Sequence, residues 1–249
     1  MEIDDLSEPH NFDKRKVFML ITANDVARMI DLSCVRTISN KSDIEEMVTA
    51  AKRYGFGQVS VLQCFIPYTR QLLTGTSDIR VVGNVSFPSG SDTTSLKVIQ
   101  AKEMIAASCD EIDMVMNIGK LRSGDLAEVE ADVQAVVEAV QPLPSKVIIE
   151  IMALTPSEVE QACHICLRCG ATFVKTGTGW LGRGTTLDDV RLIKSFIGDQ
   201  IKIKASGGIR DLTSLIAMYK EGARRFGVNL KSGISIVEEC IALGDGVEV

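Results

Sequence analysis

The sequence predicts a protein of the α/β class, a (β/α)8 TIM barrel built as a single domain, and three observations support this prediction. Eight short apolar runs alternate with helix-like segments, as in parallel sheets with helical crossovers. The runs start 22 to 35 residues apart, enough for a strand, a helix and two short loops. The chain has 249 residues, and no linker or change of composition marks a second domain.

The predicted strands are short and rich in β-branched residues. They cover residues 29–33, 58–62, 80–87, 111–118, 146–152, 172–176, 201–205 and 224–229. Eight strand–helix units of this size are typical of a closed barrel.

Explicit signals define several of the connecting helices. Leu126, Val129, Val133, Val136, Val137 and Val140 recur at helical spacing, which predicts a face packed on the barrel. A capping sequence, Thr155-Pro156-Ser157-Glu158, begins a helix over residues 156–169, and Gly170 ends it. We interpret residues 1–28 as an N-terminal helical extension, with a helix over residues 12–20 that closes the bottom of the barrel.

Composition limits the classes of function. The chain is 45% hydrophobic and 24% charged, with no apolar run long enough to cross a membrane. A net charge of -6 disfavours nucleic acid as a partner. The acidic N-terminus lacks a secretory signal, and seven scattered cysteines suit reduced thiols, so we expect a cytoplasmic protein.

Three of the polar residues in the predicted strands are unusual. They are Asp113, Lys175 and Lys204. The active site of this fold lies at the carboxyl ends of the strands. A single strand lysine more often points outward to solvent. Two lysines on consecutive strands, with an aspartate two strands earlier, favour a buried site instead.

Burial and a neighbouring ammonium both lower the pKa of a lysine, and a neutral amine can attack a carbonyl to form an iminium. An inward carboxylate such as Asp113 could then transfer protons, directly or through water. Lys202 and Lys204 are two residues apart, so both are expected to point inward, with Lys204 nearer the site.

Two glycine-containing loops predict a phosphate site. Gly207-Gly208-Ile209-Arg210 follows the seventh strand and precedes a helix capped by Asp211, and Lys231-Ser232-Gly233 follows the eighth. Glycines let backbone N–H groups approach an anion closely, and this fold commonly binds phosphate at these two loops. A Gly-Gly pair alone is more often a tight turn.

The cysteines of helix 156–169 have the spacing C-x2-C-x2-C at Cys163, Cys166 and Cys169. Thiolates at this interval can bind an iron–sulfur cluster, although cluster cysteines usually lie on loops. We therefore expect these residues on the helix surface without a metal. Neither His10 nor His164 ends a strand, so a catalytic histidine is not expected.

Several long segments, in order, resemble the 2-deoxyribose-5-phosphate aldolase family of class I aldolases. They are residues 111–119 (EIDMVMNIG), 147–150 (VIIE), 173–179 (FVKTGTG) and 203–210 (IKASGGIR). The resemblance covers about residues 31–237. It implies reversible cleavage of 2-deoxy-D-ribose 5-phosphate to glyceraldehyde 3-phosphate and acetaldehyde, with no metal or organic cofactor, and it suggests a homodimer.

The resemblance also implies roles for individual residues. Lys175 would form the Schiff base, Lys204 would tune it, and Asp113 would belong to the proton relay. The predicted substrate-binding residues are Asp31, Ser33, Thr176, Gly179, Gly207, Gly208, Ser232 and Gly233.

The chain departs from the family pattern in three places. Residues 60–63 (SVLQ) replace a common cysteine and proline, the segment 227–233 (GVNLKSG) is longer than usual, and the C-terminus lacks a tyrosine found in some members. Two alternatives stay open: the same chemistry on another aldehyde or phosphosugar, and a non-catalytic phosphosugar-binding barrel.

Overall fold

Eight parallel strands close into a barrel in the computed structural model, which describes residues 20–244 and 246–249. In order around the barrel they are β2 (Ile30–Cys34), β3 (Gln58–Val61), β4 (Arg80–Val85), β5 (Glu111–Val115), β6 (Ser145–Ile148), β7 (Phe173–Lys175), β8 (Lys202–Ser206) and β9 (Ala223–Asn229). The predicted (β/α)8 fold is confirmed.

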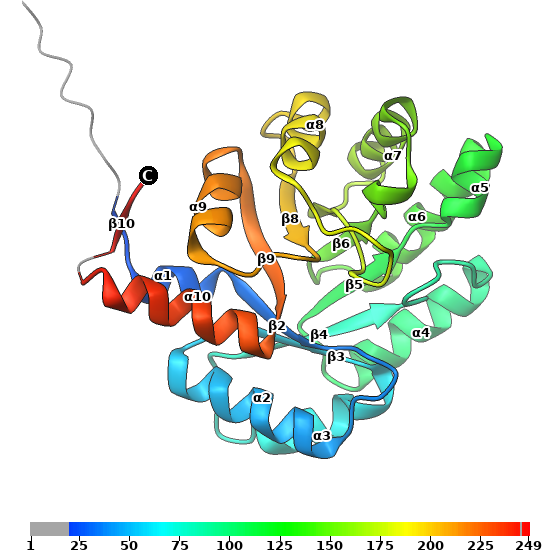
Figure 1. Cartoon of the computed structure of the whole chain (residues 1–249). Coiled ribbons are helices and arrows are strands. Elements are labelled where there is room, and N and C mark those ends of the chain that lie inside the picture. The colour runs from blue at the N-terminus through cyan, green and yellow to red at the C-terminus, as the bar shows by residue number, and fades with distance from the viewer. Residues whose placement is uncertain (1–19, 245) are drawn as a thin grey trace, which may run out of the picture.

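Helices surround the barrel as an outer layer (Figure 1). They are α1 (Ala23–Arg28), α2 (Lys41–Tyr54), α3 (Ile66–Leu72), α4 (Thr94–Ala106), α5 (Ile118–Ser123), α6 (Leu126–Val140), α7 (Pro156–Arg168), α8 (Leu187–Ile197), α9 (Leu212–Lys220) and α10 (Leu230–Ala242), with short 3-10 helices at Gln63–Phe65 and Ile151–Ala153. No described helix is long and apolar enough to span a membrane.

All eight predicted strands are present, but several end earlier than the apolar runs suggested. β5 ends at Val115 because Asn117 caps helix α5, where its side chain accepts a hydrogen bond from the Lys120 N–H. β6 ends at Ile148, and Glu150 then takes a left-handed conformation with φ 49°. Such a conformation is costly for a residue with a side chain, and it breaks the ladder.

The capping and packing signals of the helices are also borne out. Thr155 and Glu158 form a reciprocal capping box at the start of α7, and Gly170 has φ 69° just after its end. In α6 the valines of the predicted face are buried, whereas Leu126 is only partly buried. The main core therefore lies between the barrel and its helices.

The expected surface position of the cysteines on α7 is wrong. Cys163 and Cys166 are completely buried, and Cys169 is 4% exposed. The helix turns its cysteine stripe toward the core because a thiol packs as a small apolar group.

The two ends of the described chain meet in a small separate sheet. β1 (Leu20–Ile21) pairs antiparallel with β10 (Val247–Glu248). Leu20, expected in a helix, is therefore in a strand, and the rest of the predicted helix, residues 12–19, lies outside the described residues. The single-domain assignment stays a prediction, in which residues 20–28 contribute β1 and α1.

Candidate active site

Asp113 is the centre of a buried cluster of charges inside the barrel. Its Oδ2 accepts hydrogen bonds from Lys175 Nζ at 2.7 Å and from Lys204 Nζ at 2.9 Å. The strand register explains this contact, because Lys175 is paired with Lys204 across β7 and β8, and alternate residues of a strand share a face. The structure thus brings together the three residues predicted to carry catalysis.

A third lysine, which the sequence interpretation missed, completes the cluster. Lys146 on β6 is paired with Asp113 across the sheet and donates to Asp113 Oδ1 at 2.8 Å. Its ammonium also lies 2.5 Å from Glu111 Oε2, and neither residue is more than 1% exposed. The sequence contained a signal for it, since Lys146 is a charged residue at the start of the predicted strand 146–152.

Asp31 links the cluster to the first strand of the barrel. Its Oδ2 accepts a hydrogen bond from Lys204 Nζ, and its Oδ1 lies 3.6 Å from Arg225 Nη1. Lys204 is therefore held between two carboxylates, Asp31 and Asp113. Lys202 is on the same face of β8 two residues earlier, at the amino end, where the residue is exposed and its Nζ lies 5.7 Å from the centre of the Phe173 ring.

The three lysines do not have the same acid–base properties. Burial lowers the pKa of Lys175 to about 8; Asp113 opposes this shift and Lys204 adds to it. Burial alone would lower the pKa of Lys146, but the carboxylates of Asp113, Asp31 and Glu111 outweigh the effect of burial. The pKa of Lys146 is therefore raised. Burial tends to raise the pKa of Asp113, yet the surrounding ammonium groups hold it well below the usual range. Lys175 is thus readily deprotonated, whereas Asp113 stays a carboxylate.

The cluster opens into a cavity at the carboxyl end of the barrel. Lys175 and Lys204 line a small chamber together with Ser33, Ser60 and Asn84. This chamber shares Ser33, Thr178, Ser206 and Gly227 with a larger cavity of about 290 Å³. The carboxyl end is where this fold places its active sites.

Glycines form one wall of the larger cavity. Gly179, Gly207 and Gly208 line it, each with a positive φ between 75° and 99°. A Cβ on Gly208 would lie 2.8 Å from the Gly184 Cα, so a side chain would not fit there. These loops expose backbone close to the cavity, as an anion site requires.

Three of the predicted substrate-binding residues do not line the cavity. Thr176 is fully buried and ties β7 to β8, accepting from the Ser206 N–H at 2.9 Å. Ser232 and Gly233 lie inside α10, and a Cβ on Gly233 would collide with Leu32. Asn229, the N-cap of α10, lines the cavity instead. α10 begins at Leu230, directly after β9, so Ser232 and Gly233 are buried near the start of this helix.

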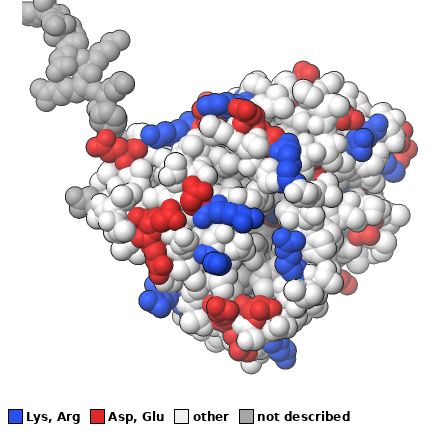
Figure 2. Space-filling view, in the orientation of Figure 1, with Lys and Arg blue, Asp and Glu red and all other residues white. Residues whose placement is uncertain are grey.

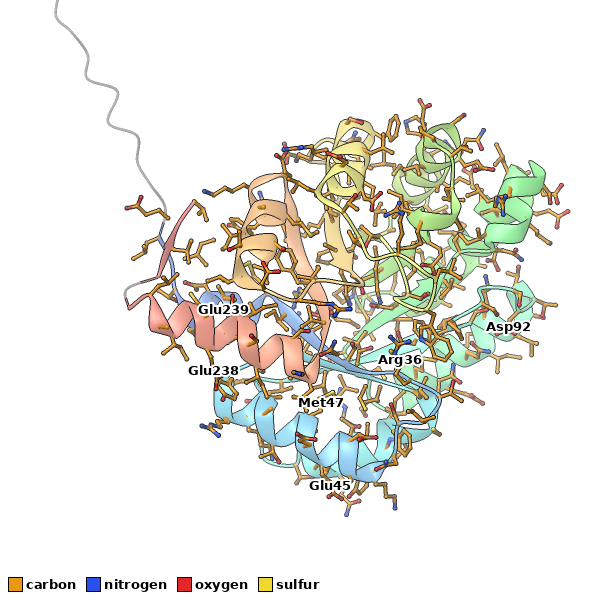
Figure 3. All side chains as sticks on the ribbon, in the orientation of Figure 1. Arg36, Glu45, Met47, Asp92, Glu238 and Glu239 are labelled. Carbon is orange, nitrogen blue, oxygen red and sulfur yellow. The ribbon has the colours of Figure 1, made fainter. Side chains whose placement is uncertain are left out.

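Cationic side chains surround the opening of this cavity. Arg36, Arg183 and Arg210 line it, and Figure 2 shows Lys and Arg side chains around the middle of this face. Arg36 follows β2 beside the open end of the barrel (Figure 3), with its guanidinium 5.9 Å from the centre of the Trp180 ring. A chain with net charge -6 thus presents a cationic entrance to its cavity.

A buried carboxylate supports the loop beyond Lys175. Glu150 accepts hydrogen bonds from the N–H and hydroxyl of Thr178, the latter at 2.6 Å. The strained backbone of Glu150 therefore positions one wall of the chamber. The described residues include no group of three or more His, Cys, Asp or Glu side chains arranged to hold a metal ion.

Fold and site together define a class: an α/β barrel with an amine of lowered pKa at the base of a cavity at its carboxyl end. The DeoC/LacD family aldolase model matches residues 25–235, so this chain belongs to the DeoC/LacD family of aldolases, which are lyases.

Individual relatives agree with this assignment. The chain is 39% identical over 223 residues to a deoxyribose-phosphate aldolase of Sinorhizobium medicae, covering 90% of each chain. It is also similar to the solved structure of QR15, an aldolase, with a TM-score of 0.82, 36% identity and coverage of 88% and 96%. The tetrameric deoxyribose phosphate aldolase of Aeropyrum pernix, at 23% identity, shares the fold with a TM-score of 0.81 and coverage of 89% and 93%.

Proposed function

We propose that this protein reversibly cleaves 2-deoxy-D-ribose 5-phosphate to D-glyceraldehyde 3-phosphate and acetaldehyde through a Schiff base at Lys175. The observation that carries the proposal is a buried amine with a pKa of about 8 in a chamber that adjoins a cavity lined by glycines and arginines. The family and its named relatives supply the substrate.

The reaction begins at the Lys175 amine. The neutral amine attacks C1 of the open-chain sugar phosphate, and the resulting carbinolamine loses water to form an iminium. Proton loss from the C3 hydroxyl then breaks the C2–C3 bond, and its electron pair moves to the iminium. Glyceraldehyde 3-phosphate leaves; protonation of the enamine at C2 and hydrolysis release acetaldehyde and restore the amine.

The neighbours of Lys175 have distinct parts in these steps. Asp113, a carboxylate within 2.7 Å of Lys175 Nζ, orients the amine and transfers protons directly or through water. Lys204 lowers the pKa of Lys175 by repulsion and holds Asp113 in place. Lys146 is a positioning residue, because it fixes the other oxygen of Asp113. Asp31 acts through Lys204, and Ser33 borders the chamber where the sugar would lie.

The phosphate is expected at the far end of the larger cavity. Gly179, Gly207 and Gly208 offer backbone there, and Arg210 offers positive charge. Asn229 replaces Ser232 and Gly233 as the contact from the last strand. No metal or organic cofactor takes part in the proposed mechanism.

Reductive trapping tests the mechanism. Treatment with 2-deoxyribose 5-phosphate and borohydride should add mass irreversibly to the peptide that contains Lys175, and the Lys175→Arg variant should show no such addition. An adduct at another lysine, or none, would overturn the assignment of Lys175.

A coupled assay tests the substrate. Acetaldehyde release from 2-deoxyribose 5-phosphate, followed with an alcohol dehydrogenase and NADH, should require Lys175. No release, together with trapping of another aldehyde at Lys175, would favour a different aldolase substrate. Absence of both would favour a non-catalytic phosphosugar-binding barrel.

Treatment with a chelator should leave activity unchanged, because the proposed electron sink is an iminium. Activity that is lost in the chelator and restored by a divalent ion would contradict the Schiff-base mechanism.

We also propose that the protein is a cytoplasmic homo-oligomer, with a dimer as the first expectation. Sedimentation velocity would measure the oligomeric state; the relative from Aeropyrum pernix is a tetramer.

A further inference from the structure

A second cavity, the floor cavity, lies at the opposite, amino end of the barrel. It is bounded by the first residues of β7, β8 and β9 and by the segment after α8, and its volume is about 270 Å³. This is room for several water molecules. It shares none of its lining residues with the catalytic cavity or the chamber above Lys175.

The lining of this floor cavity is strongly cationic. Lys194, Lys202, Arg224 and Arg225 all border it. Asp199 is the only acidic side chain among its described lining residues, and it is already bonded to Lys194. Within the described part of the chain, neither Lys202 nor Arg224 has a carboxylate partner within ion-pair distance. Such a concentration of positive charge is unexpected in a chain of net charge -6.

Arg225 is held in place at the inner wall of the floor cavity. Its side chain is only 18% exposed, and its Nη1 lies 3.6 Å from Asp31 Oδ1. Its Nε is buried and makes no hydrogen bond to any residue in the described ranges. A buried donor without a partner is costly, so an anion beside this guanidinium would offset part of that cost.

The start of β9 explains why two consecutive arginines reach this cavity. The ladder between β8 and β9 is irregular, because Ile203 pairs with Ala223 and Lys204 pairs with Arg225. The extra residue is Arg224, which rests against the Tyr219 ring 4.7 Å away. A bulge of this kind redirects side chains at the rim of a barrel.

We propose that the floor cavity is a binding site for a phosphate-like oxyanion, either inorganic phosphate or the phosphoryl group of a phosphomonoester. Guanidinium groups match the geometry of phosphate oxygens, and a dianion suits several converging cations better than a single carboxylate does. The site is separate from the place proposed for the substrate phosphate.

Glycines at the two ends of the barrel make the sites distinguishable in one experiment. Gly198 and Gly222 line the floor cavity, whereas Gly207 and Gly208 line the catalytic cavity. Inorganic phosphate would be titrated into the full chain at constant ionic strength, with chloride as the balancing anion, and followed in proton–nitrogen correlation spectra. The amide signals of Gly198 and Gly222 should shift and saturate.

A paired variant identifies the cations responsible. Lys202→Gln together with Arg224→Gln should weaken phosphate binding at Gly198 and Gly222 by about tenfold or more, since each change removes a charge-assisted contact. Gly207 and Gly208 should respond as in the unmodified protein. Both substituted side chains are exposed, so the fold should be retained. Lys220→Gln, on the exposed surface of α9, is the matched control and should bind as the unmodified chain does.

Two results would overturn the proposal: no saturable shift at Gly198 and Gly222, or the same phosphate affinity there in the double variant. Glycerol 3-phosphate, which has no carbonyl group, separates the two sources of the anion. Equal affinity for it and for inorganic phosphate at these glycines would assign the site to the free ion. Tighter binding of glycerol 3-phosphate would assign it to a phosphomonoester.

Discussion

Lys175 has the environment on which the proposed chemistry depends, and that environment predicts a pH dependence. Because its pKa is about 8, the neutral amine should predominate only above this pH. The rate of borohydride trapping with acetaldehyde should therefore rise through a midpoint near pH 8. In Lys204→Gln a repelling ammonium is lost, so the pKa of Lys175 should rise and the midpoint should move to higher pH.

Lys202→Gln is the control for this measurement, because Lys202 lies at the other end of β8 with its ammonium exposed. Its midpoint should equal that of the unmodified chain. A midpoint that falls, or does not move, in Lys204→Gln would contradict the repulsion between Lys204 and Lys175.

Lys146 should contribute strongly to stability, because it neutralises two buried carboxylates. Lys146→Met would leave Glu111 and Asp113 with less compensation, which should lower the free energy of unfolding by about 3–5 kcal/mol. Urea denaturation would measure this loss. Lys102→Met, at an exposed position on α4, should change the same quantity by less than about 0.5 kcal/mol. A loss below about 1 kcal/mol in Lys146→Met would show that Lys146 is not needed to balance the cluster.

At the scale of single elements, helix α7 shows how a sequence pattern can be assigned to the wrong face of a helix. The sequence interpretation placed these cysteines on a helix, which the structure confirms for Cys163 and Cys166, but it did not expect them to be buried. The distinction depends on which side of α7 contacts α6, α8 and the barrel, and no local sequence signal specifies that side.

The buried face of α7 predicts unequal thiol reactivity. Burial raises the pKa of Cys163 to about 12, so its reactive thiolate is scarce at pH 8. Iodoacetamide should label exposed Cys64 quickly and leave Cys163 and Cys166 unlabelled until urea is added. Peptide mass spectrometry would locate the label. Labelling of all three at one rate would place the α7 cysteines on the surface.

Strand lengths illustrate a further limit at this scale. Apolar residues continue past the last ladder pair of β5 and β6, so hydrophobicity alone makes these strands too long. The ends are set by a side-chain cap at Asn117 and by a left-handed backbone at Glu150. The Asn117 cap is a local contact with the Lys120 N–H, whereas Glu150 bonds to Thr178, a contact that exists only after β6 and β7 are aligned.

At the scale of the whole molecule, the pairing of β1 with β10 joins the ends of the described chain. Ile21 is 4% exposed in this arrangement. Removal of residues 247–249 should expose it and lower the free energy of unfolding by about 1–3 kcal/mol. Activity per folded molecule should be unchanged, since none of these residues lines the catalytic cavity.

Glu248→Ala is the control for this truncation, because it changes an exposed side chain and keeps the strand. Differential scanning calorimetry would compare the variants. Equal stability of the truncated and full chains would show that the β1–β10 sheet contributes nothing to the fold.

The sequence by itself determined the number and order of the barrel strands, the caps of α7 and α9, and Asp113, Lys175 and Lys204 as a group. These features follow from local periodicity and from the rule that the carboxyl ends of barrel strands converge. Only the tertiary structure decided that Lys146 and Asp31 complete the cluster and that Asn229 replaces Ser232 and Gly233 at the cavity. It also decided that four cationic side chains line the floor cavity. Those outcomes depend on register between strands and on which face of each helix is buried, and contacts between residues distant in sequence set both.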